Sequence, residues 1–404
     1  MKKKISILCS NLSNNALGRS YLLGSLLNDD FSVEIMGPLY ADQEIWAPLR
    51  HNTTVSITPF RISRPPESYH QIKELYRKID GDIIYANKTY FISVGLGFLK
   101  KVRDKVPLVV DIDDWDLGFA LYRFRNMCLK DKVKNSFGWM TQLPRCYESN
   151  RAASMFFYQR LARFADAITV SNTFLQRRFG GHLIPHVRDT SVLCPQRYDH
   201  VKLREKYKIS SHTKIISFIG TPRVFKGIED LVEAVLMVDD PDLSLMIVGA
   251  DPEYHYTKTI ESKAAALKKQ GRLIMIEQQP FAALPEFLAM SDIIAIPQRK
   301  CIATVGQIPA KVFDAMAMEK AIVATAVSDL PEILKDCGWI AEPNNPKDLA
   351  HAIREILSQN EDVAEKKKNA RIKCISHYST DKYKQILVSL LDHVNKGYRY
   401  ASEV

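Results

Sequence analysis

Residues 293–331 read IIAIPQRKCIATVGQIPAKVFDAMAMEKAIVATAVSDLP, and this stretch decides the fold of the 404-residue chain. The pattern predicts an apolar strand over 293–296, a polar loop over 297–308, a helix over 309–318 and a second apolar strand over 321–325. Short strands that are apolar throughout are typical of a parallel sheet covered by helices on both faces.

The start of the predicted helix has the chemistry of an anion site. Pro309 suits the first turn of a helix, because the N–H group that proline lacks would have no partner there. The free N–H groups of a helix start and the positive end of the helix dipole favour an anion such as a diphosphate. Lys311 and Asp314 are three residues apart and share one face. A cation and a carboxylate here predict a nucleotide, with phosphate at one end and ribose hydroxyls at the other.

The N-terminal half also alternates strands and helices. Apolar strands are predicted over 5–9, 82–86, 108–112 and 167–170, and helical spacing over 17–27. This order is typical of a parallel sheet, and such sheets bind ligands beyond the carboxyl ends of their strands. A chain of this length is long enough for two domains. The sequence therefore predicts an α/β protein with two parallel-sheet domains.

These residues also resemble a known family. The order of a polar loop, QIPAKVFDAMAMEKAIVAT and DLPEIL resembles the nucleotide-sugar site of glycosyltransferase family 4, the retaining enzymes of GT-B architecture. Members usually carry a Glu in the loop and a second Glu eight positions later. Here Gly306 takes the first position and Asp314 the second, so the chain resembles a divergent branch without the leading Glu. The resemblance implies two Rossmann-like domains that face each other across a cleft.

The same resemblance implies which residues hold the donor. GTPRVFKG, residues 220–227, resembles the glycine-rich turn that grips the donor phosphates, so Lys226 and Arg223 are the implied catalytic cations. EQQP at 277–280 resembles the turn that binds the base. Gly18 is a lone glycine after the first predicted strand, and the alternative to a donor-binding role for it is a purely structural role in the turn. The implied donor-binding residues are Gly18, Gly220, Lys226, Gln278, Gly306, Gln307, Ile308, Lys311 and Asp314.

Four acidic residues lie at the end of the strand 108–112: Asp111, Asp113, Asp114 and Asp116. They predict either a functional cluster or a helix start capped by Asp. Carboxylates can ligate hard metal ions, but the resemblance implies metal-independent transfer without a cofactor. Many relatives have a His at this strand end. The resemblance therefore implies that Asp113 faces the sugar and joins the catalytic set.

Residues 119–163 are too long for a plain connection and predict a helical insertion. They hold nine Lys and Arg against two acidic residues, with aromatic residues between them. Such a mixture can lie at the headgroups of an anionic membrane, and a packed helical pair with solvated cations explains it equally well. Nucleic acid is the weakest alternative, because no known binding motif accompanies the charge. Residues 1–200 hold 28 Lys and Arg against 19 Asp and Glu, so this half carries most of the net charge of +10.

We predict three parts of the chain. Residues 1–195 form a Rossmann-like acceptor-binding domain, residues 196–375 a Rossmann-like nucleotide-sugar-binding domain, and residues 376–404 a helix that, as the resemblance implies, crosses back to the first domain. Seven scattered cysteines without a CxxC pair argue against a disulfide framework. No stretch is apolar for long enough to span a bilayer. We expect a cytoplasmic protein, with peripheral contact to the inner face of the cell membrane as a further option.

The expected function is retaining transfer of a sugar from a nucleotide-diphosphate sugar to a hydroxyl of a glycan or lipid-linked acceptor, as in polysaccharide biosynthesis. No side chain stands out as a nucleophile or base, which is consistent with the front-face mechanism that the resemblance implies. Two alternatives stay open. A GT-B sugar-nucleotide epimerase would use Asp113 and Asp114 as acids. A non-catalytic partner subunit is permitted by Gly306 in place of the first Glu.

Overall fold

The computed structural model describes residues 2–40, 42–51, 54–63, 66–128 and 152–397. The chain divides into unit 1, Met1–His186 with Tyr383–Val404, and unit 2, Val187–Lys382. The sequence predicts the first boundary at 195/196, nine residues after the observed one, and the second at 375/376, seven residues before the observed one. The assignment of the units to acceptor and donor stays a prediction. Residues 129–151 of the predicted insertion lie outside the described residues.

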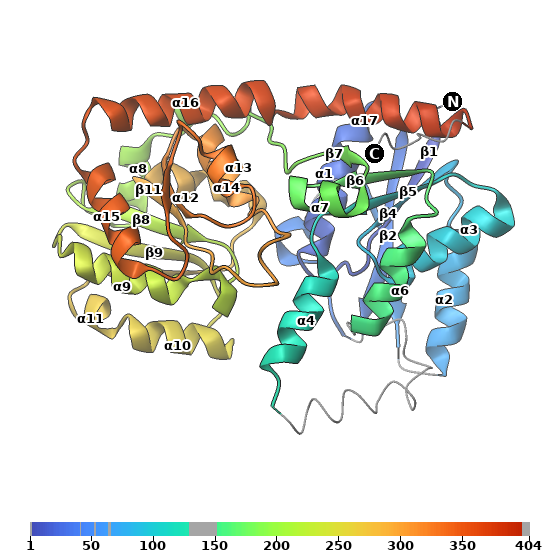
Figure 1. The fold of residues 1–404 in the computed structure, drawn as a ribbon, viewed down its shortest axis with the longest axis horizontal. Coiled ribbons are helices and arrows are strands. Elements are labelled where there is room, and N and C mark those ends of the chain that lie inside the picture. Colours follow the sequence, from blue (N-terminus) through green and yellow to red (C-terminus); the bar gives the residue numbers. More distant parts are fainter. Residues whose placement is uncertain (1, 41, 52–53, 64–65, 129–151, 398–404) are drawn as a thin grey trace. The chain divides into compact units, whose positions relative to one another are not determined.

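Within the described residues of unit 1, seven parallel strands form one sheet in the order β3-β2-β1-β4-β5-β6-β7 (Figure 1). The strands are β1 (Lys4–Leu8), β2 (Ser32–Tyr40), β3 (Ser56–Ile62), β4 (Ile83–Asn87), β5 (Leu108–Ile112), β6 (Ala167–Val170) and β7 (His182–Leu183). The helices are α1 (Ala16–Leu27), α2 (Glu67–Lys78), α3 (Leu96–Asp104), α4 (Asp116–Asn126), α6 (Ala152–Ala162) and α7 (Thr173–Phe179), with short helical turns at Ala47–Leu49 and Phe91–Gly95.

The direction of the chain reverses in the middle of this sheet. From β1 it runs through β2 to β3 on one side, and from β4 through β5 and β6 to β7 on the other. Because connections between parallel strands are right-handed, this reversal puts helices on both faces. It also creates a switch point between β1 and β4, where α/β sheets bind ligands beyond their carboxyl ends.

Unit 2 has a sheet of the same type, with the order β10-β9-β8-β11-β12-β13 among its described residues. The strands are β8 (Lys214–Ile219), β9 (Leu243–Ala250), β10 (Leu273–Glu277), β11 (Ile293–Ile296), β12 (Ala321–Thr325) and β13 (Trp339–Ala341). The helices are α8 (His200–Lys206), α9 (Ile228–Val238), α10 (His255–Lys263), α11 (Ala265–Lys269), α12 (Leu284–Met290), α13 (Lys311–Ala317), α14 (Leu330–Ile333), α15 (Pro346–Leu357) and α16 (Glu361–His377), with short turns at Pro195–Arg197, Val224–Lys226 and Phe281–Ala283.

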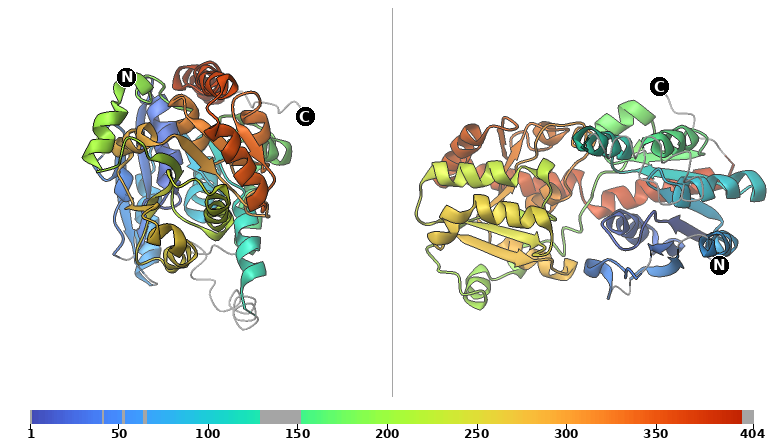
Figure 2. Two further views of the ribbon diagram at one scale, coloured as in Figure 1. Left: turned by 90° about the vertical axis from the view of Figure 1, so that its left-hand side faces the viewer. Right: turned by 90° about the horizontal axis from the view of Figure 1, so that it is seen from below.

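Alternate residues of each strand in unit 2 enter two separate cores. In β11, Ile293 and Ala295 pack with residues of α9, α10 and α15, whereas Ile294 and Ile296 pack with residues of α12, α13 and α16. Figures 1 and 2 show these helices on the two faces of the sheet. Helices cover both faces of β11, and this is why the strand has no polar face. The predicted α/β fold with two parallel sheets is confirmed.

The predicted helix over 309–318 is shorter in the structure. Helix α13 comprises only seven residues, Lys311–Ala317. Pro309 precedes it, and the Pro309 carbonyl oxygen accepts a hydrogen bond from the N–H of Val312 at 3.0 Å. A turn that leads into a helix tolerates proline as well as the first helical turn does. Fewer aligned peptide dipoles make this start a weaker anion site than the prediction assumed, so side chains must supply more of the charge.

Helix α17 (Thr380–Asn395) belongs to unit 1 from Tyr383 onward. Lys384 Nζ lies 2.7 Å from Asp29 Oδ2, just beyond the end of α1. Among the described residues, no helix is both long and apolar enough to cross a membrane.

Candidate functional site

A glycine holds the loop after β8 against the end of β11. Gly227 has a φ of +69°, and a Cβ atom there would lie 1.8 Å from the carbonyl oxygen of Pro297. No side chain fits at that distance, so the turn requires glycine. The N–H of Arg299 donates to the carbonyl oxygen of Phe225 at 3.0 Å, which is a second link between the same two loops. Lys226 lies between these two links, and its position is therefore set by the backbone.

Lys226 and Gln307 form the polar contact at this edge of the sheet. Lys226 Nζ donates to Gln307 Oε1 at 3.0 Å, and Gln298 Nε2 donates to the same oxygen at 3.2 Å. The loops after β8 and β11 meet because these strands are neighbours. Gly306 is buried, and the side chain of Ile308 packs into the core. Ile308 can therefore contribute to a binding surface only through its backbone.

Two arginines near Lys226 differ in their partners. Arg299 pairs with Asp230 at 2.6 Å and with Glu229 at 2.9 Å, at the first turn of α9. Its charge is thus neutralised within the protein. Arg223 is exposed, and its guanidinium lies 4.6 Å from the ring centroid of Tyr254. No carboxylate in the described part of the chain forms an ion pair with Arg223, so its charge is available to an anionic ligand.

Asp314 is the centre of a buried ion-pair cluster. Its side chain is 2% exposed, and Lys311 Nζ lies 3.0 Å from its Oδ2. The guanidinium of Arg188 pairs with the other carboxylate oxygen and donates to the carbonyl oxygen of Ala310 at 3.1 Å. The structure thus brings the predicted pair together and adds a second cation. Two cations beside one carboxylate leave a positive charge that suits a phosphate.

Burial and charge act in opposite directions on the pKa values of this cluster. Burial lowers the pKa of Lys311, and Asp314 only partly opposes that effect. Burial by itself would raise the pKa of Asp314, but Arg188 and Lys311 outweigh it and hold this pKa below its usual value. Asp314 is therefore ionised at neutral pH, and both of its oxygens are acceptors of hydrogen bonds.

The remaining predicted donor-binding residues are Gly220, Gln278 and Gly18, and their positions are given by backbone features rather than by side-chain contacts. Gly220 follows β8 and has a φ of +143°. Gly249, on the neighbouring strand, lies so close that a Cβ atom added to it would be 2.8 Å from the carbonyl oxygen of Gly220. Gln278 is exposed after β10, at the carboxyl edge but two strands away from β8. Gly18 lies in the first turn of α1, where its N–H donates to the carbonyl oxygen of Asn15 at 3.1 Å. The Gly18 N–H is thus already used within the turn.

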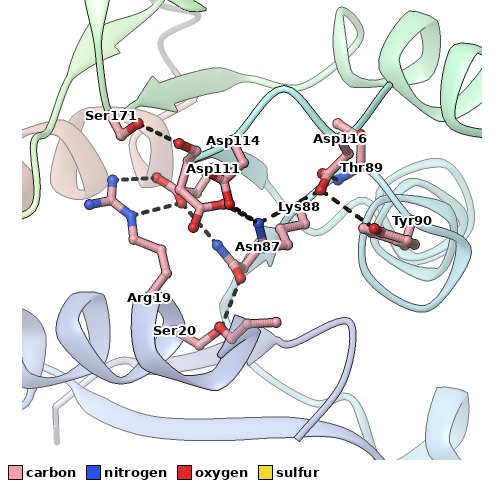
Figure 3. A network of polar contacts seen from close by, with 12 residues as sticks. Arg19, Ser20, Asn87, Lys88, Thr89, Tyr90, Asp111, Asp114, Asp116 and Ser171 are labelled. Atoms are coloured by element: carbon pink, nitrogen blue, oxygen red, sulfur yellow. Dashed lines mark hydrogen bonds and ion pairs between the residues drawn. The ribbon is translucent and has the colours of Figure 1, made fainter. Parts of the chain in front are cut away.

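In unit 1, a buried ion pair ties α1 to β5. Arg19 Nη2 and Nε lie 2.9 and 3.0 Å from the two oxygens of Asp111, and both side chains are almost fully buried (Figure 3). Asn87 and Thr169 donate to the same carboxylate at 2.9 and 2.7 Å. Because its oxygens are engaged by four neighbouring donors, Asp111 has a structural role at this sheet edge.

Lys88, directly after β4, gathers the other three acidic residues. It is 6% exposed and has a φ of +65°. Figure 3 shows its ammonium group among carboxylates from the DIDDWD segment. The distances from Lys88 Nζ are 2.8 Å to Asp113 Oδ1, 2.9 Å to Asp114 Oδ2 and 3.7 Å to Asp116 Oδ1. Helix α4 begins at Asp116, next to this cluster, but its N-cap residue is Trp115 and no side chain caps the helix, so the predicted Asp cap is wrong. The functional role of the cluster stays a prediction.

Burial first, and then the excess of carboxylates over cations, raises pKa values in this cluster. Burial raises the pKa of Asp113 to about 7; Lys88 opposes the shift, and the carboxylates of Asp114 and Asp111 add to it. Burial also raises the pKa of Asp116. A carboxyl group with a pKa near 7 can donate or accept a proton at neutral pH.

These contacts weaken the metal interpretation of the acidic segment. In the described ranges, no group of three or more His, Cys, Asp or Glu side chains is arranged to hold a metal ion. The carboxylates of this segment are instead held by Lys88 and Arg19. Metal-independent transfer stays a prediction.

Comparison with known proteins identifies the domain that carries the Lys226 and Asp314 contacts. Residues 199–373 match the family model described as Glycosyl transferases group 1. This domain belongs to the group 1 glycosyltransferases, family 4. The glycosyltransferase domain thus covers most of unit 2, and the resemblance noted in its sequence is confirmed at the level of the family.

Two curated relatives show how far the likeness extends. The chain is 28% identical over 166 residues to N-acetyl-alpha-D-glucosaminyl L-malate synthase of Bacillus anthracis, covering 40% of this chain and 41% of that protein. It is 26% identical over 302 residues to D-inositol 3-phosphate glycosyltransferase of Corynebacterium glutamicum, covering 70% of this chain and 66% of the relative. The matches therefore span less than two thirds of the length of either relative.

Solved structures match nearly the whole chain. Sucrose-phosphate synthase from Thermosynechococcus elongatus has a TM-score of 0.74 at 15% identity and covers 98% of this chain and 100% of its own. HepE from Anabaena, in complex with UDP-glucose, has a TM-score of 0.75 at 16% identity and covers 96% and 99%. These likenesses show that the glycosyltransferase domain is part of a GT-B fold.

Sequence reasoning missed three residues that hold these clusters. Arg188 and Gln298 reach their partners only through the folded chain, and no local pattern indicates them. A signal for Lys88 did exist, because it follows a buried strand at the same sheet edge as the acidic segment.

Proposed function

We propose that this chain is a retaining glycosyltransferase that moves a sugar from a nucleotide-diphosphate sugar to a hydroxyl of a glycan or lipid-linked acceptor. The observation that carries the proposal is the carboxylate of Asp314 paired with Arg188 and Lys311, together with Lys226, which is held by Gln307 on the loop that leads into the same helix. Lys226 follows β8, and Lys311 and Asp314 follow the loop after β11, so these three residues lie near the switch point between the two strands. Phosphates would pair with the cations, and ribose hydroxyls with the carboxylate.

In this proposal, positively charged side chains stabilise the leaving diphosphate. Lys226, Arg223 and Lys311 are in place before the reaction, so they need little reorganisation when charge develops on the departing phosphate. Asp314 accepts hydrogen bonds from the ribose. Gly220 and Gly306 leave room for the donor, and backbone groups near Gln278 hold the base. The complex of HepE with UDP-glucose supports a nucleotide sugar as the donor class.

Proton transfer needs no dedicated base in this scheme. The acceptor hydroxyl forms its bond to the anomeric carbon on the face from which the diphosphate leaves, and the diphosphate oxygen takes the hydroxyl proton. The anomeric configuration is therefore retained, and no metal ion is required. Asp113 is the proposed sugar-facing group of unit 1, held in place by Lys88.

The location and acceptor class are part of the same proposal. A cytoplasmic protein with peripheral contact to the inner face of the membrane fits an acceptor that is lipid-linked or part of a polysaccharide. The excess of basic residues in the first 200 positions supports contact with an anionic surface.

A thermal-shift panel with UDP, GDP, ADP and their sugars tests the donor class. A ligand at a hundred times its dissociation constant adds about 2.7 kcal/mol to the stability of the folded state. We expect one base to raise the unfolding temperature of the wild type and to have a smaller effect on Lys226→Ala. The matched control is Lys258→Ala on α10, which removes one charge elsewhere in unit 2. If no nucleotide shifts the wild type, the proposal fails.

Release of the nucleoside diphosphate separates the alternatives. Release that requires an acceptor supports sugar transfer. Interconversion of the donor sugar without an acceptor would instead indicate an epimerase. Donor binding without turnover on any glycan or lipid acceptor would indicate a non-catalytic partner subunit.

A further inference from the structure

An open pocket of about 290 Å³ lies in unit 1 between α6 and α7, which are labelled and drawn in green in Figure 1. None of its lining residues belongs to the donor site proposed above. The lining residues are Phe156, Gln159, Arg160, Arg163, Arg178 and Phe179.

Three arginines give this pocket a positive charge. Among the described residues, no carboxylate forms an ion pair with Arg160, Arg163 or Arg178. The guanidinium of Arg160 lies 5.0 Å from the ring centroid of Phe156, and that of Arg178 lies 4.5 Å from the ring centroid of Trp115. A guanidinium that lies over an aromatic ring keeps its N–H groups for hydrogen bonds in its own plane. The pocket thus presents several charged donors, and its described lining holds no acid that could neutralise them.

Gln159 supplies a second, independent observation. It is the buried member of the lining, with 6% of its surface exposed, and its Nε2 finds no hydrogen-bond acceptor among the described residues. A buried amide without a partner destabilises the folded state. An acceptor oxygen of a bound molecule would remove that cost. The buried donor and the arginines therefore require the same chemistry, an anion with several acceptor oxygens.

The ligand has an apolar part as well as an anionic part. Phe156 and Phe179 line the pocket beside the arginines, and Phe156 exposes 50% of its surface. Exposed apolar side chains beside a basic cluster are typical of sites that bind a phosphate carried on an apolar group.

We propose that this pocket binds a phosphate monoester or diester that carries an apolar substituent, either in a lipid headgroup or in a water-soluble molecule. Arg160, Arg163 and Arg178 pair with the phosphate oxygens, and Gln159 donates one further hydrogen bond. The phenylalanines contact the substituent. This inference does not depend on the proposed transferase activity.

Tryptophan fluorescence provides the binding assay, because Arg178 lies against the ring of Trp115. The probes are inorganic phosphate, dihexanoyl phosphatidic acid below its micelle concentration, and phosphatidylcholine vesicles with and without phosphatidylglycerol. The same titrations of Trp115→Phe assign the signal. Saturable binding of a soluble phosphate identifies a water-soluble source, and binding only to the phosphatidylglycerol vesicles identifies a lipid source. Absence of binding to all the probes overturns the proposal.

Three variants distinguish a built site from a basic surface. Arg160→Glu should weaken binding at least about tenfold, because a hydrogen bond to a charged group is lost. Gln159→Leu should also weaken binding while leaving the unfolding temperature unchanged or higher, because it removes an unpaired buried amide. Arg177→Glu makes the same charge change on the exposed side of α7 and should change affinity less than about twofold. Equal losses in Arg160→Glu and Arg177→Glu, or unchanged affinity in Gln159→Leu, would refute the pocket.

Discussion

Replacing Gly227 by Ala should destabilise unit 2 more than the same replacement at Gly271. The two glycines have nearly equal φ angles, +69° and +70°, so both variants pay the same backbone cost, about 1–2 kcal/mol for an L-residue in the left-handed region. Their surroundings differ. At Gly271 no heavy atom lies within 4 Å of the added Cβ atom, whereas at Gly227 the carbonyl oxygen of Pro297 is 1.8 Å away.

The clash at Gly227 should separate two loops that carry the donor site. The Cβ atom and the oxygen must move about 1.2 Å apart to reach even 3.0 Å, the shortest approach that real Cβ atoms show. Such a shift breaks the hydrogen bonds from Arg299 to Phe225 and from Lys226 to Gln307, both of 3.0 Å. Together these bonds contribute about 2–4 kcal/mol.

We therefore expect a loss of about 3–6 kcal/mol for Gly227→Ala and of about 1–2 kcal/mol for Gly271→Ala. Urea unfolding followed by circular dichroism measures both, and a nucleotide titration should show weakened donor binding only for Gly227→Ala. Equal losses of stability in the two variants would refute the close approach of the two loops. Unchanged donor affinity in Gly227→Ala would refute the placement of Lys226 in the site.

The remaining predictions concern the charged residues. Lys226→Ala should lower turnover at saturating donor more than tenfold, or over about 1.4 kcal/mol, and unchanged kcat would remove Lys226 from the site. Arg188→Met and Asp314→Asn should each lower the free energy of unfolding in urea by about 2–4 kcal/mol. The double variant should lose about 1.5–3 kcal/mol less than the sum of the two single losses, and additivity within about 0.5 kcal/mol would contradict the buried pair. The pKa of Asp113 is raised to about 7 when folded, from about 3.9 when unfolded, so the folded state binds the extra proton and the wild type loses stability as pH rises from about 4 to 7. Asp113→Asn should therefore gain stability relative to the wild type across this range, and a difference in urea midpoint that does not change with pH would contradict the shift.

Local patterns were enough to predict the main strands. The apolar runs at 108–112 and 293–296 are strands β5 and β11 with the predicted bounds. A strand buried on both faces has no polar period, so its composition alone indicates its place in the middle of a layered sheet. The pairing of Lys311 with Asp314 follows from helical spacing in the same way. The start of the helix was predicted two residues early, because proline suits both the first turn and the turn before it.

Only the tertiary structure decided which distant residues share a site. Lys226 reaches Gln307, and Lys88 gathers the acids after β5, because the order of strands in each sheet puts their carboxyl ends side by side. Arg188 reaches Asp314 from the segment at the start of unit 2, far from it in the sequence. Strand order depends on how whole layers pack and on the handedness of each connection. The residues next to a site do not predict either of these. The sequence by itself thus determined the type of fold and the residue types of the donor site. Folding decided which charges are neutralised by other parts of the chain and which are available to a ligand.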